Sequence, residues 1–527
     1  RADESTGARA GQGGGNRGQA QKRHPVAMAD VGKQQSREHG DSTDHEGRQI
    51  SDCQTVHSTP SPLPTAMFAT TDIGTMYPPR WLCVAGLNRR SCALARYRQW
   101  VAHLAAVSTD AHRDITDDAV VIVGGGPVGL LAATLLARRG IRVVVLEAAG
   151  SKDRQRHRNC ATFVGHSTLR RYDRVAPELG ARLRQSALAV HGVQTFYQGR
   201  PVFVMSSYAP SRIPGPWNPA AWGMSLSQRT IEEESLAEAL NLGVEYHCGI
   251  AVTDISTDHT GARLTLSSGD RLRASYVIAA DGSRSAIRQA LGIGMSERPP
   301  SPPSAVIDVE PHPDGVTLDL PVQIQYHHPD LGGRHAIRLP YPDGLRLDVQ
   351  FLPHDEATPS TELVRSWVTA LTGDTWYADH IRSVEVHQTV QGVASSYTDV
   401  NRRVLLAGEA AHQFAPLGGR SLNSGVADAA AAAEAIAEAL GEPSDLAAAW
   451  LAINRSARER RRSGVRNRIL SVRAQRVLDG SDVSMRARRT MAAKSAPHIW
   501  IAGAWLTAGL VRPTAIPHIS RSGVTWS

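Results

Sequence analysis

The chain has 527 residues, a length that predicts roughly two or three domains. Hydrophobic residues make up 41% of it, slightly less than in a typical globular protein, so part of the chain is expected to lie outside a packed core. The formal net charge is +8, with arginines concentrated between Arg455 and Arg468. We interpret this run as a solvated helix face and expect no nucleic-acid partner, because no nucleic-acid module stands beside it.

The five cysteines are scattered and show no CxxC spacing. This pattern argues against a disulfide framework or a metal site and fits a reducing, cytoplasmic compartment. The longest apolar stretch near the end, Ile499 to Val511, is too short for a bilayer, which needs about 20 residues. We therefore expect a packed segment and no stable membrane insertion. We also expect a monomer or a homodimer.

Residues 1–113 are rich in Gly, Gln, Ser, Asp and Arg and show little periodicity. Low hydrophobic content cannot compensate the entropy lost on ordering. The region is therefore predicted to be disordered or an extension outside the functional domain.

The character of the sequence changes at Asp118. Ala119 to Val123 is a short apolar run typical of a buried parallel strand, and a glycine-rich turn follows it. Leu130 to Arg139 has helical periodicity, Gly140 ends that helix, and Ile141 to Leu146 predicts a second buried strand. Together they form a βαβ unit.

The middle of the chain predicts an antiparallel sheet. Its strands are expected at 304–309, 316–326, 335–339 and 345–352, with Pro-Asp-Gly turns between some of them. A further buried strand at 404–407 leads through a glycine-rich loop to an alanine-rich helix at 426–440. Arginine-rich helices are expected from there to Asp479.

The first motif is Gly124-x-Gly126-x-x-Gly129, preceded by a strand and followed by a helix. In this context Gly124 permits a tight turn, Gly126 admits a pyrophosphate, and Gly129 lets helix and strand pack closely. The helix start offers N–H groups to phosphates, and Glu147, at the end of the second strand, can accept hydrogen bonds from ribose hydroxyls. A second match, Gly13-x-Gly15-x-x-Gly18, lacks these flanking elements and is rejected.

Two further strands end in glycine and a carboxylate. Tyr276 to Ala280 leads into Asp281-Gly282, and Val404 to Ala407 leads into Gly408-Glu409. Ligands of open α/β sheets bind at the carboxyl ends of the strands, so all three motifs are expected to face one crevice.

With these motifs in this order, the chain resembles the class A, para-hydroxybenzoate hydroxylase-like flavoprotein monooxygenases. The resemblance covers about Ala119 to Leu440, and it includes an arginine stretch at Arg158 and a Gln-x-x-x-Glu helix start at Gln228. It implies an α/β fold, with a Rossmann-like FAD-binding domain, an inserted mixed or antiparallel β-sheet substrate domain and a helical C-terminal part. The expected boundaries are 114–186, 224–300 and 400–441 for the FAD-binding domain, 187–223 and 301–399 for the sheet domain, and 442–527 for the helical region.

The resemblance also assigns roles to residues. The adenosine diphosphate part of FAD would be held by the glycine motif and Glu147, and the pyrophosphate and ribityl region by Arg158 and Gln228. Asp281 would serve both FAD and NAD(P)H, while loop backbone groups would line the isoalloxazine. The full expected cofactor set is Gly124, Gly126, Pro127, Gly129, Glu147, Arg158, Gln228, Asp281, Gly282, Gly408, Glu409, Pro416, Gly418, Gly419, Leu422 and Asn423.

The chain departs from the family at two positions. The family usually has Asp where Glu409 stands and Gly where Ser421 stands. If the backbone at Ser421 needs a positive φ, serine costs on the order of 1 kcal/mol or more there. His412, in the same region, is interpreted as a structural hydrogen-bonding residue.

The implied reaction is hydroxylation of an aromatic or polyketide-like small molecule by NADPH or NADH and O2, through a flavin C4a-hydroperoxide. Deprotonation of a phenol needs a positioned group, for which Tyr326, His327 and His335 are weak candidates, each better explained by packing. Trp217 and Trp222 could stack on a flat substrate.

Two alternatives stay open. One is another FAD-dependent oxidoreductase, a reductase or halogenase, although no WxWxIP motif of the tryptophan halogenases is present. The other is a non-catalytic homologue that binds FAD poorly.

Overall fold

The computed structural model describes residues 119–150, 161–206, 223–388, 390–441, 445–480, 482–511, 518–520 and 523–525. The chain divides into two units, 1–82 and 83–527, and every described residue belongs to the second. The expectation for residues 1–113 and the roles suggested for Arg158, Trp217 and Trp222 fall outside the described residues.

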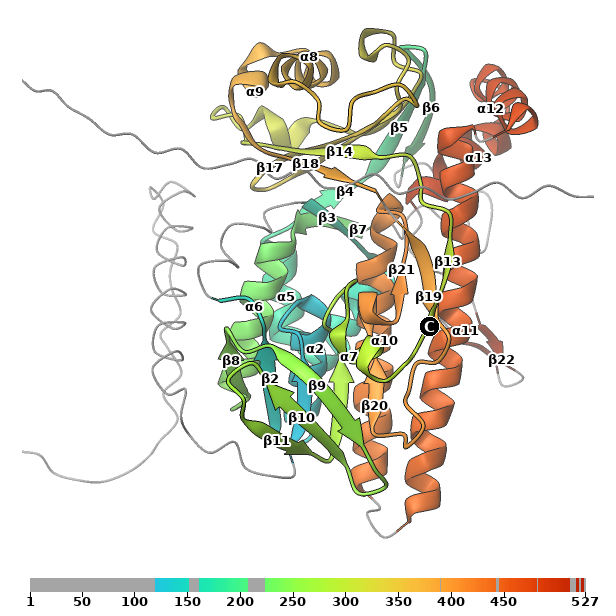
Figure 1. The fold of residues 1–527 in the computed structure, drawn as a ribbon. Coiled ribbons are helices and arrows are strands. Elements are labelled where there is room, and N and C mark those ends of the chain that lie inside the picture. The colour runs from blue at the N-terminus through green and yellow to red at the C-terminus, as the bar shows by residue number, and fades with distance from the viewer. Residues whose placement is uncertain are drawn as a thin grey trace, which may run out of the picture. The chain divides into compact units, whose positions relative to one another are not determined.

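A parallel five-stranded sheet forms the first layer (Figure 1). Its order is β20 (Val404–Leu406), β12 (Tyr276–Ala279), β1 (Val120–Val123), β2 (Val143–Glu147) and β8 (Glu245–Cys248). The predicted βαβ unit is confirmed, because β1 pairs in parallel with β2 and α2 (Pro127–Ala137) connects them. Since β1, β12 and β20 are adjacent and parallel, the three motifs that follow them lie at one edge of the sheet.

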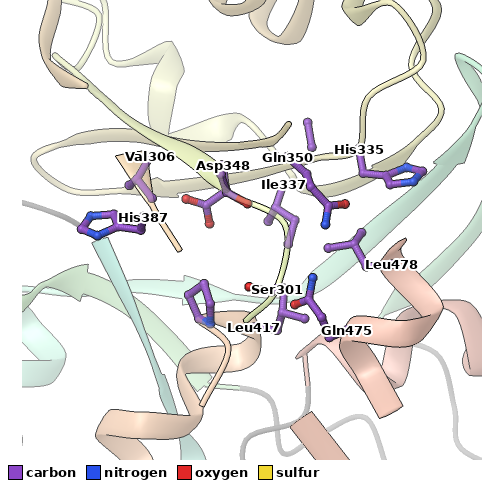
Figure 2. Close-up of a pocket in the computed structure, with 13 residues that line it drawn as sticks. Ser301, Val306, His335, Ile337, Asp348, Gln350, His387, Leu417, Gln475 and Leu478 are labelled. Carbon is purple, nitrogen blue, oxygen red and sulfur yellow. The ribbon is translucent and has the colours of Figure 1, made fainter. Parts of the chain in front are cut away.

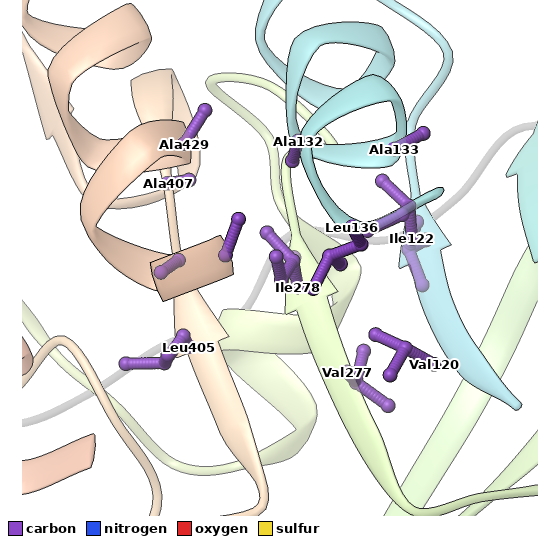
Figure 3. Packing of buried hydrophobic residues seen from close by; sticks show 14 of the residues in the cluster. Val120, Ile122, Ala132, Ala133, Leu136, Val277, Ile278, Leu405, Ala407 and Ala429 are labelled. Atoms are coloured by element: carbon purple, nitrogen blue, oxygen red, sulfur yellow. The ribbon is translucent and has the colours of Figure 1, made fainter. Parts of the chain in front are cut away.

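Small side chains pack the helices onto this sheet. Figure 3 shows Ala132 of α2 and Ala429 of α10 (Arg420–Gly441) above Ile278 and Leu405, and all four side chains are buried. α10 contacts both α2 and the long helix α11 (Leu446–Asp479), and α2 also contacts α6 (Gln228–Asn241). The antiparallel strands β9 (Val252–Thr257), β10 (Ala262–Leu266) and β11 (Arg271–Ala274) contribute to the same core.

The second large sheet is seven-stranded and mixed. Its strands, in spatial order, are β18 (Ile381–His387), β14 (Ser304–Val309), β17 (Gly344–Gln350), β16 (Ala336–Tyr341), β15 (Val322–Tyr326), β5 (Gly192–Tyr197) and β6 (Arg200–Ser206). Neighbours are antiparallel except β15 and β5. The outward face of β17 packs its leucines and valine on Trp367 of α8 (Thr361–Thr372) and on α9 (Thr375–Asp379).

One strand prediction was wrong in its first half. Val316–Asp319 is a 3-10 turn, and pairing with β5 begins at Val322. The Thr317 hydroxyl accepts a hydrogen bond from the His312 amide at 2.7 Å and shares another with the Tyr377 hydroxyl at 2.8 Å. These local bonds stabilise a turn over a strand.

A small sheet of β3 (Ala161–Gly165), β7 (Gly223–Ser227) and β4 (Leu188–Val190) contacts both the parallel-sheet domain and the seven-stranded sheet. The Ser225 hydroxyl on β7 donates to the Pro340 carbonyl on β16 at 2.6 Å. A further small sheet contains β13 (Met295–Arg298), β19 (Gln391–Ala394) and β21 (His412–Gln413). The remaining elements are α4 (His166–Val175), α5 (Pro177–Gln185), α7 (Ala286–Ala290), α12 (Val483–Ser495), α13 (Trp500–Val511), β22 (His518–Ser520), β23 (Gly523–Thr525) and short 3-10 turns.

The expected mixed α/β architecture with a helical C-terminal part is confirmed. Across the described ranges, no helix combines the length and the apolar character that crossing a membrane would require.

Candidate functional site

The glycine turn after β1 fits a dinucleotide pyrophosphate. Gly124 has a φ of +105°, and a Cβ there would lie 2.3 Å from the Ala280 carbonyl oxygen, so a larger residue is excluded. Gly126 caps α2, Pro127 and Gly129 stand in its first turn, and the amides of that turn lack acceptors within the helix. Glu147 accepts hydrogen bonds from the amides of Gly125 (2.6 Å) and Ala149 (2.9 Å), which place its carboxylate beside the turn.

The Asp281-Gly282 motif follows β12 at the same edge of the sheet. One carboxylate oxygen of Asp281, Oδ2, accepts a hydrogen bond from the Ile287 amide at 3.1 Å and anchors α7. The other, Oδ1, is buried and has no partner among the described residues. Burial raises the pKa of Asp281, and the hydrogen bond from the Ile287 amide and the charge of Arg288 offset part of that rise. An unsatisfied buried oxygen of this kind needs a donor that a bound ligand can supply.

The loop after β20 contains the third motif. Gly408 is buried with a φ of +62°, whereas Glu409 is exposed at the strand end. Pro416, Gly418 and Gly419 follow and turn the chain into α10. A Cβ at Gly419 would lie 2.3 Å from the Phe163 carbonyl oxygen, so this loop can approach β3 only with glycine there.

Asn423, in the first turns of α10, joins this loop to β3. Its Oδ1 accepts from the Gly165 amide at 2.9 Å, and its Nδ2 donates to the carbonyls of Phe163 and Gly419 at 2.8 Å. Leu422 packs against the core beside it. Ser421 lies within α10 and is not among the residues of positive φ, so the strain considered for a serine there does not arise.

Sequence analysis did not identify Gly425 or Asp428, which pack against or bond the first and third motifs. A Cβ at Gly425 would meet Val128 of the glycine motif at 2.6 Å and Gly408 at 3.1 Å. Buried Asp428 accepts hydrogen bonds from the Gly408 amide at 3.2 Å and Arg460 Nε at 2.7 Å, and it bonds His412 Nε2 at 2.6 Å. The structural role expected for His412 agrees with this bond. For Asp428, the signal available in the sequence was its helical spacing from Ser424.

Gln228 begins α6, which the Ser227 hydroxyl caps through the Thr230 amide. Its side-chain amide donates to Glu232 Oε1 at 2.9 Å, so the Gln-x-x-x-Glu spacing forms one turn of helix with both ends joined.

A pocket lies between the 416–419 loop and the inward face of the seven-stranded sheet. Its walls are mostly apolar, with one charged pair. The lining residues are Ala161, Thr162, Phe163, Val190, Val193, Val322, Ile324, Ile337, Leu339, Arg346, Asp348, Pro416, Leu417, Gly418 and Gly419.

Arg346 and Asp348 also escaped the sequence analysis. They alternate along β17 with Leu345, Leu347 and Val349, which face α8. Arg346 Nε donates to Asp348 Oδ1 at 2.9 Å, and its Nη1 donates to the Ala161 carbonyl at 2.9 Å. The alternation of charged and apolar residues along β17 could be read from the sequence. The strand pairing that directs Arg346 and Asp348 toward the 416–419 loop could not.

A second pocket adjoins the first (Figure 2). The two share Ile337, Asp348, Pro416 and Leu417. The second has more polar residues in its lining, among them His335, Gln350, His387 and Gln475.

Of the weak catalytic candidates, only His335 lines either of these pockets. Tyr326 is fully buried, donates to the Leu506 carbonyl at 2.8 Å, and has a pKa raised by burial. His327 Nε2 bonds buried Arg489 at 2.6 Å, and burial together with Arg489 lowers the pKa of His327. Burial, Arg489 and His327 lower the pKa of His335 to about 2. These groups join α12 to the sheet.

The residues present fit FAD. Backbone amides at the start of α2 are free to bind a phosphate, and the Glu147 carboxylate lies beside the same turn. Asp281 offers an oxygen that lacks a donor. Gly124 and Gly419, where a Cβ would lie 2.3 Å from a carbonyl oxygen, border the same region.

Comparisons with known proteins agree. A family model described as an FAD binding domain matches residues 117–462. The chain is 28% identical over 327 residues to dialkyldecalin synthase from Streptomyces rugosporus, covering 59% of this chain and 63% of that protein. It is 30% identical over 323 residues to the 12-dehydrotetracycline 5-monooxygenase/anhydrotetracycline 6-monooxygenase of Streptomyces rimosus, covering 59% and 60%. The chain thus spans less than two thirds of these relatives' length.

Among solved structures, p-nitrophenol 4-monooxygenase from Pseudomonas putida DLL-E4 has a TM-score of 0.58 at 23% identity, covering 75% of this chain and 98% of that chain. A likeness at this identity shows the fold. The family match covers well over half of the chain, and it establishes the class. The chain belongs to the FAD-binding-domain family of class A flavoprotein monooxygenases, and its cofactor is FAD.

Proposed function

We propose that this protein is a monooxygenase that hydroxylates an aromatic or polyketide-like small molecule with NADPH or NADH and O2. The observation that supports this most directly is the pocket between the 416–419 loop and the sheet. Bound FAD supplies the redox and oxygen chemistry, and the protein contributes binding, orientation and exclusion of water. The apolar strand residues would hold a flat ring against the loop.

The expected cofactor contacts are part of this proposal. The glycine turn, Glu147 and Gln228 would bind the nucleotide side of FAD, and the Asp281 carboxylate would accept a hydrogen bond from it. Loop residues Pro416 to Asn423 would present backbone groups to the isoalloxazine, since oriented N–H groups stabilise charge that develops nearby. We also propose a cytoplasmic location, which the scattered cysteines support, and a monomer or homodimer.

One relative favours a second candidate. Dialkyldecalin synthase carries a name that describes no hydroxylation. We therefore keep open a redox-neutral reaction in which this chain binds FAD and a polyketide-like substrate without consuming NAD(P)H.

The test uses the full chain with FAD, NADPH or NADH, and a panel of phenols and polycyclic polyketides under ¹⁸O2. A hydroxylase is expected to retain yellow FAD, consume NAD(P)H faster with its substrate, and place ¹⁸O in the product. Retained FAD with a substrate converted in the absence of NAD(P)H would support the redox-neutral candidate instead. Protein that stays folded but colourless with added FAD would contradict both.

A further inference from the structure

Asp348 is a carboxylate in an otherwise apolar strip of the sheet. Across the neighbouring strands its backbone partners are Val306 on β14 and Ile337 on β16. All three residues line the second pocket, and Asp348 and Ile337 line both. Figure 2 shows Asp348 on the sheet side, with Leu417 of the 416–419 loop across the pocket.

Arg346 holds one oxygen of this carboxylate. Its Nε donates to Oδ1 of Asp348, while Nη1 is anchored on the Ala161 carbonyl of β3. No hydrogen bond within the described residues uses Asp348 Oδ2. Both side chains keep a little exposure, 17% for Arg346 and 18% for Asp348, and both line the first pocket. The pair is therefore oriented, with one acceptor oxygen available to a ligand.

From this geometry, and resting on the proposed function, we infer that Asp348 is the catalytic base that accepts the proton of the substrate hydroxyl. In this step the substrate O–H bond breaks and an Oδ2–H bond forms. The O–H electron pair stays on the substrate oxygen, so a hydroxyl and a carboxylate become a phenolate and a carboxyl group. The total charge is unchanged, and the ring gains the electron density that an electrophilic oxygen requires.

Arg346 acts as the positioning residue in this step. Its guanidinium stays beside the carboxylate, where it also lies close to the negative charge that moves onto the substrate oxygen. Because Arg keeps its charge, it stabilises that oxygen before and after the proton moves. The polar second pocket, with Gln350 and His387, would take the part of the substrate distant from the hydroxylated ring.

The test compares Asp348→Asn with wild type in the full, FAD-loaded chain, on phenols of different acidity. An ordinary phenol ionises near pH 10 and arrives with its proton at neutral pH. On such phenols we expect Asp348→Asn to lower kcat by a factor of about 100 or more. The remaining activity should rise with pH as the phenol ionises in solution. On nitrophenols that are already ionised, the variant should match wild type.

A binding measurement needs no turnover. The probe is 4-nitrophenol, titrated by equilibrium dialysis below and above its own pKa. The wild-type carboxylate should favour the neutral phenol and repel the phenolate, so affinity should fall as pH rises. Asp348→Asn should lose this preference. Asp348→Glu, which keeps the acid, should recover part of the activity on neutral phenols.

Asp343→Asn is the matched control, because Asp343 is an exposed carboxylate in the turn that precedes β17. It should leave both measurements unchanged. The inference is overturned if Asp348→Asn, with its flavin spectrum intact, keeps wild-type kcat on neutral phenols or loses activity equally on neutral and ionised ones. If wild type retains FAD but hydroxylates no substrate, the proposed function fails, and an unchanged pH preference in the binding titration would separately overturn the role of Asp348.

Discussion

The cofactor half and the substrate half of the candidate site are built from different chemical groups. The cofactor half consists mainly of glycines and backbone amides that follow β1, β12 and β20, and a Cβ at Gly124 or Gly419 would lie 2.3 Å from a main-chain carbonyl oxygen. The substrate half consists mainly of side chains that project at every second position from β15, β16 and β17. A backbone site is therefore specific for a shape common to the family, whereas a side-chain site can change its ligand without a change of fold.

A buried charged network supports the backbone of the cofactor half from behind, and the largest effect on stability is expected there. The largest test is Asp428→Asn, because Asp428 is fully buried between His412, Arg460 and the Gly408 amide. Removing one charge from such a network costs about 3–5 kcal/mol, since its partners stay buried and uncompensated. Urea unfolding followed by circular dichroism should show that loss. The exposed pair Arg455–Glu438 provides the control, and Glu438→Gln should cost less than about 1 kcal/mol.

The pH dependence of this variant has a definite sign. Burial opposes the charge of Asp428, but Arg460 and His412 outweigh it and hold the pKa of Asp428 below its ordinary value of 3.8. Tyr397 and Arg171 face the same carboxylate. Since the native pKa is depressed, the stabilisation is fully present above about pH 4 and is lost as pH falls through the native value. The difference in the free energy of unfolding between wild type and variant should therefore become smaller below about pH 4. A difference that stays constant as the pH falls below 4 would refute this account.

Gly124→Ala sharpens the contrast from the backbone side. Its Cβ would lie 2.3 Å from a carbonyl oxygen at a φ of +105°. We expect a loss of about 1–3 kcal/mol in the free energy of unfolding together with loss of FAD, measured by flavin absorbance after gel filtration. Gly294→Ala is the control, because no atom lies within 4 Å of its Cβ and its φ is not positive. Equal FAD retention by both variants would show that the turn tolerates a side chain.

The same contrast explains what sequence could predict. The βαβ unit and the three motifs rest on short local patterns, so the backbone of the cofactor half could be predicted without a structure. Arg346 and Asp348 were missed because their direction depends on the register of β17 against β14 and β16, which no local pattern reports. The wrong assignment at 316–319 has a related cause, since Thr317 bonds to His312 and Tyr377, and Tyr377 lies 60 residues away in the sequence.

The smallest effect is expected where the chain departs from its family, at Ser421. Restoring the family residue with Ser421→Gly would seem to favour FAD if a positive φ were needed. Ser421 instead lies in the first turn of α10 outside the positive-φ region, so glycine there adds only conformational freedom to the unfolded chain. We expect a loss of about 0.5–1 kcal/mol in stability and a change in FAD affinity below about threefold, equivalent to about 0.7 kcal/mol. Fluorescence titration of FAD measures the affinity. A tenfold tighter complex would mean that the 416–419 loop must rearrange to bind the flavin. The backbone geometry of the cofactor half in this structure would then differ from that of the FAD-bound conformation.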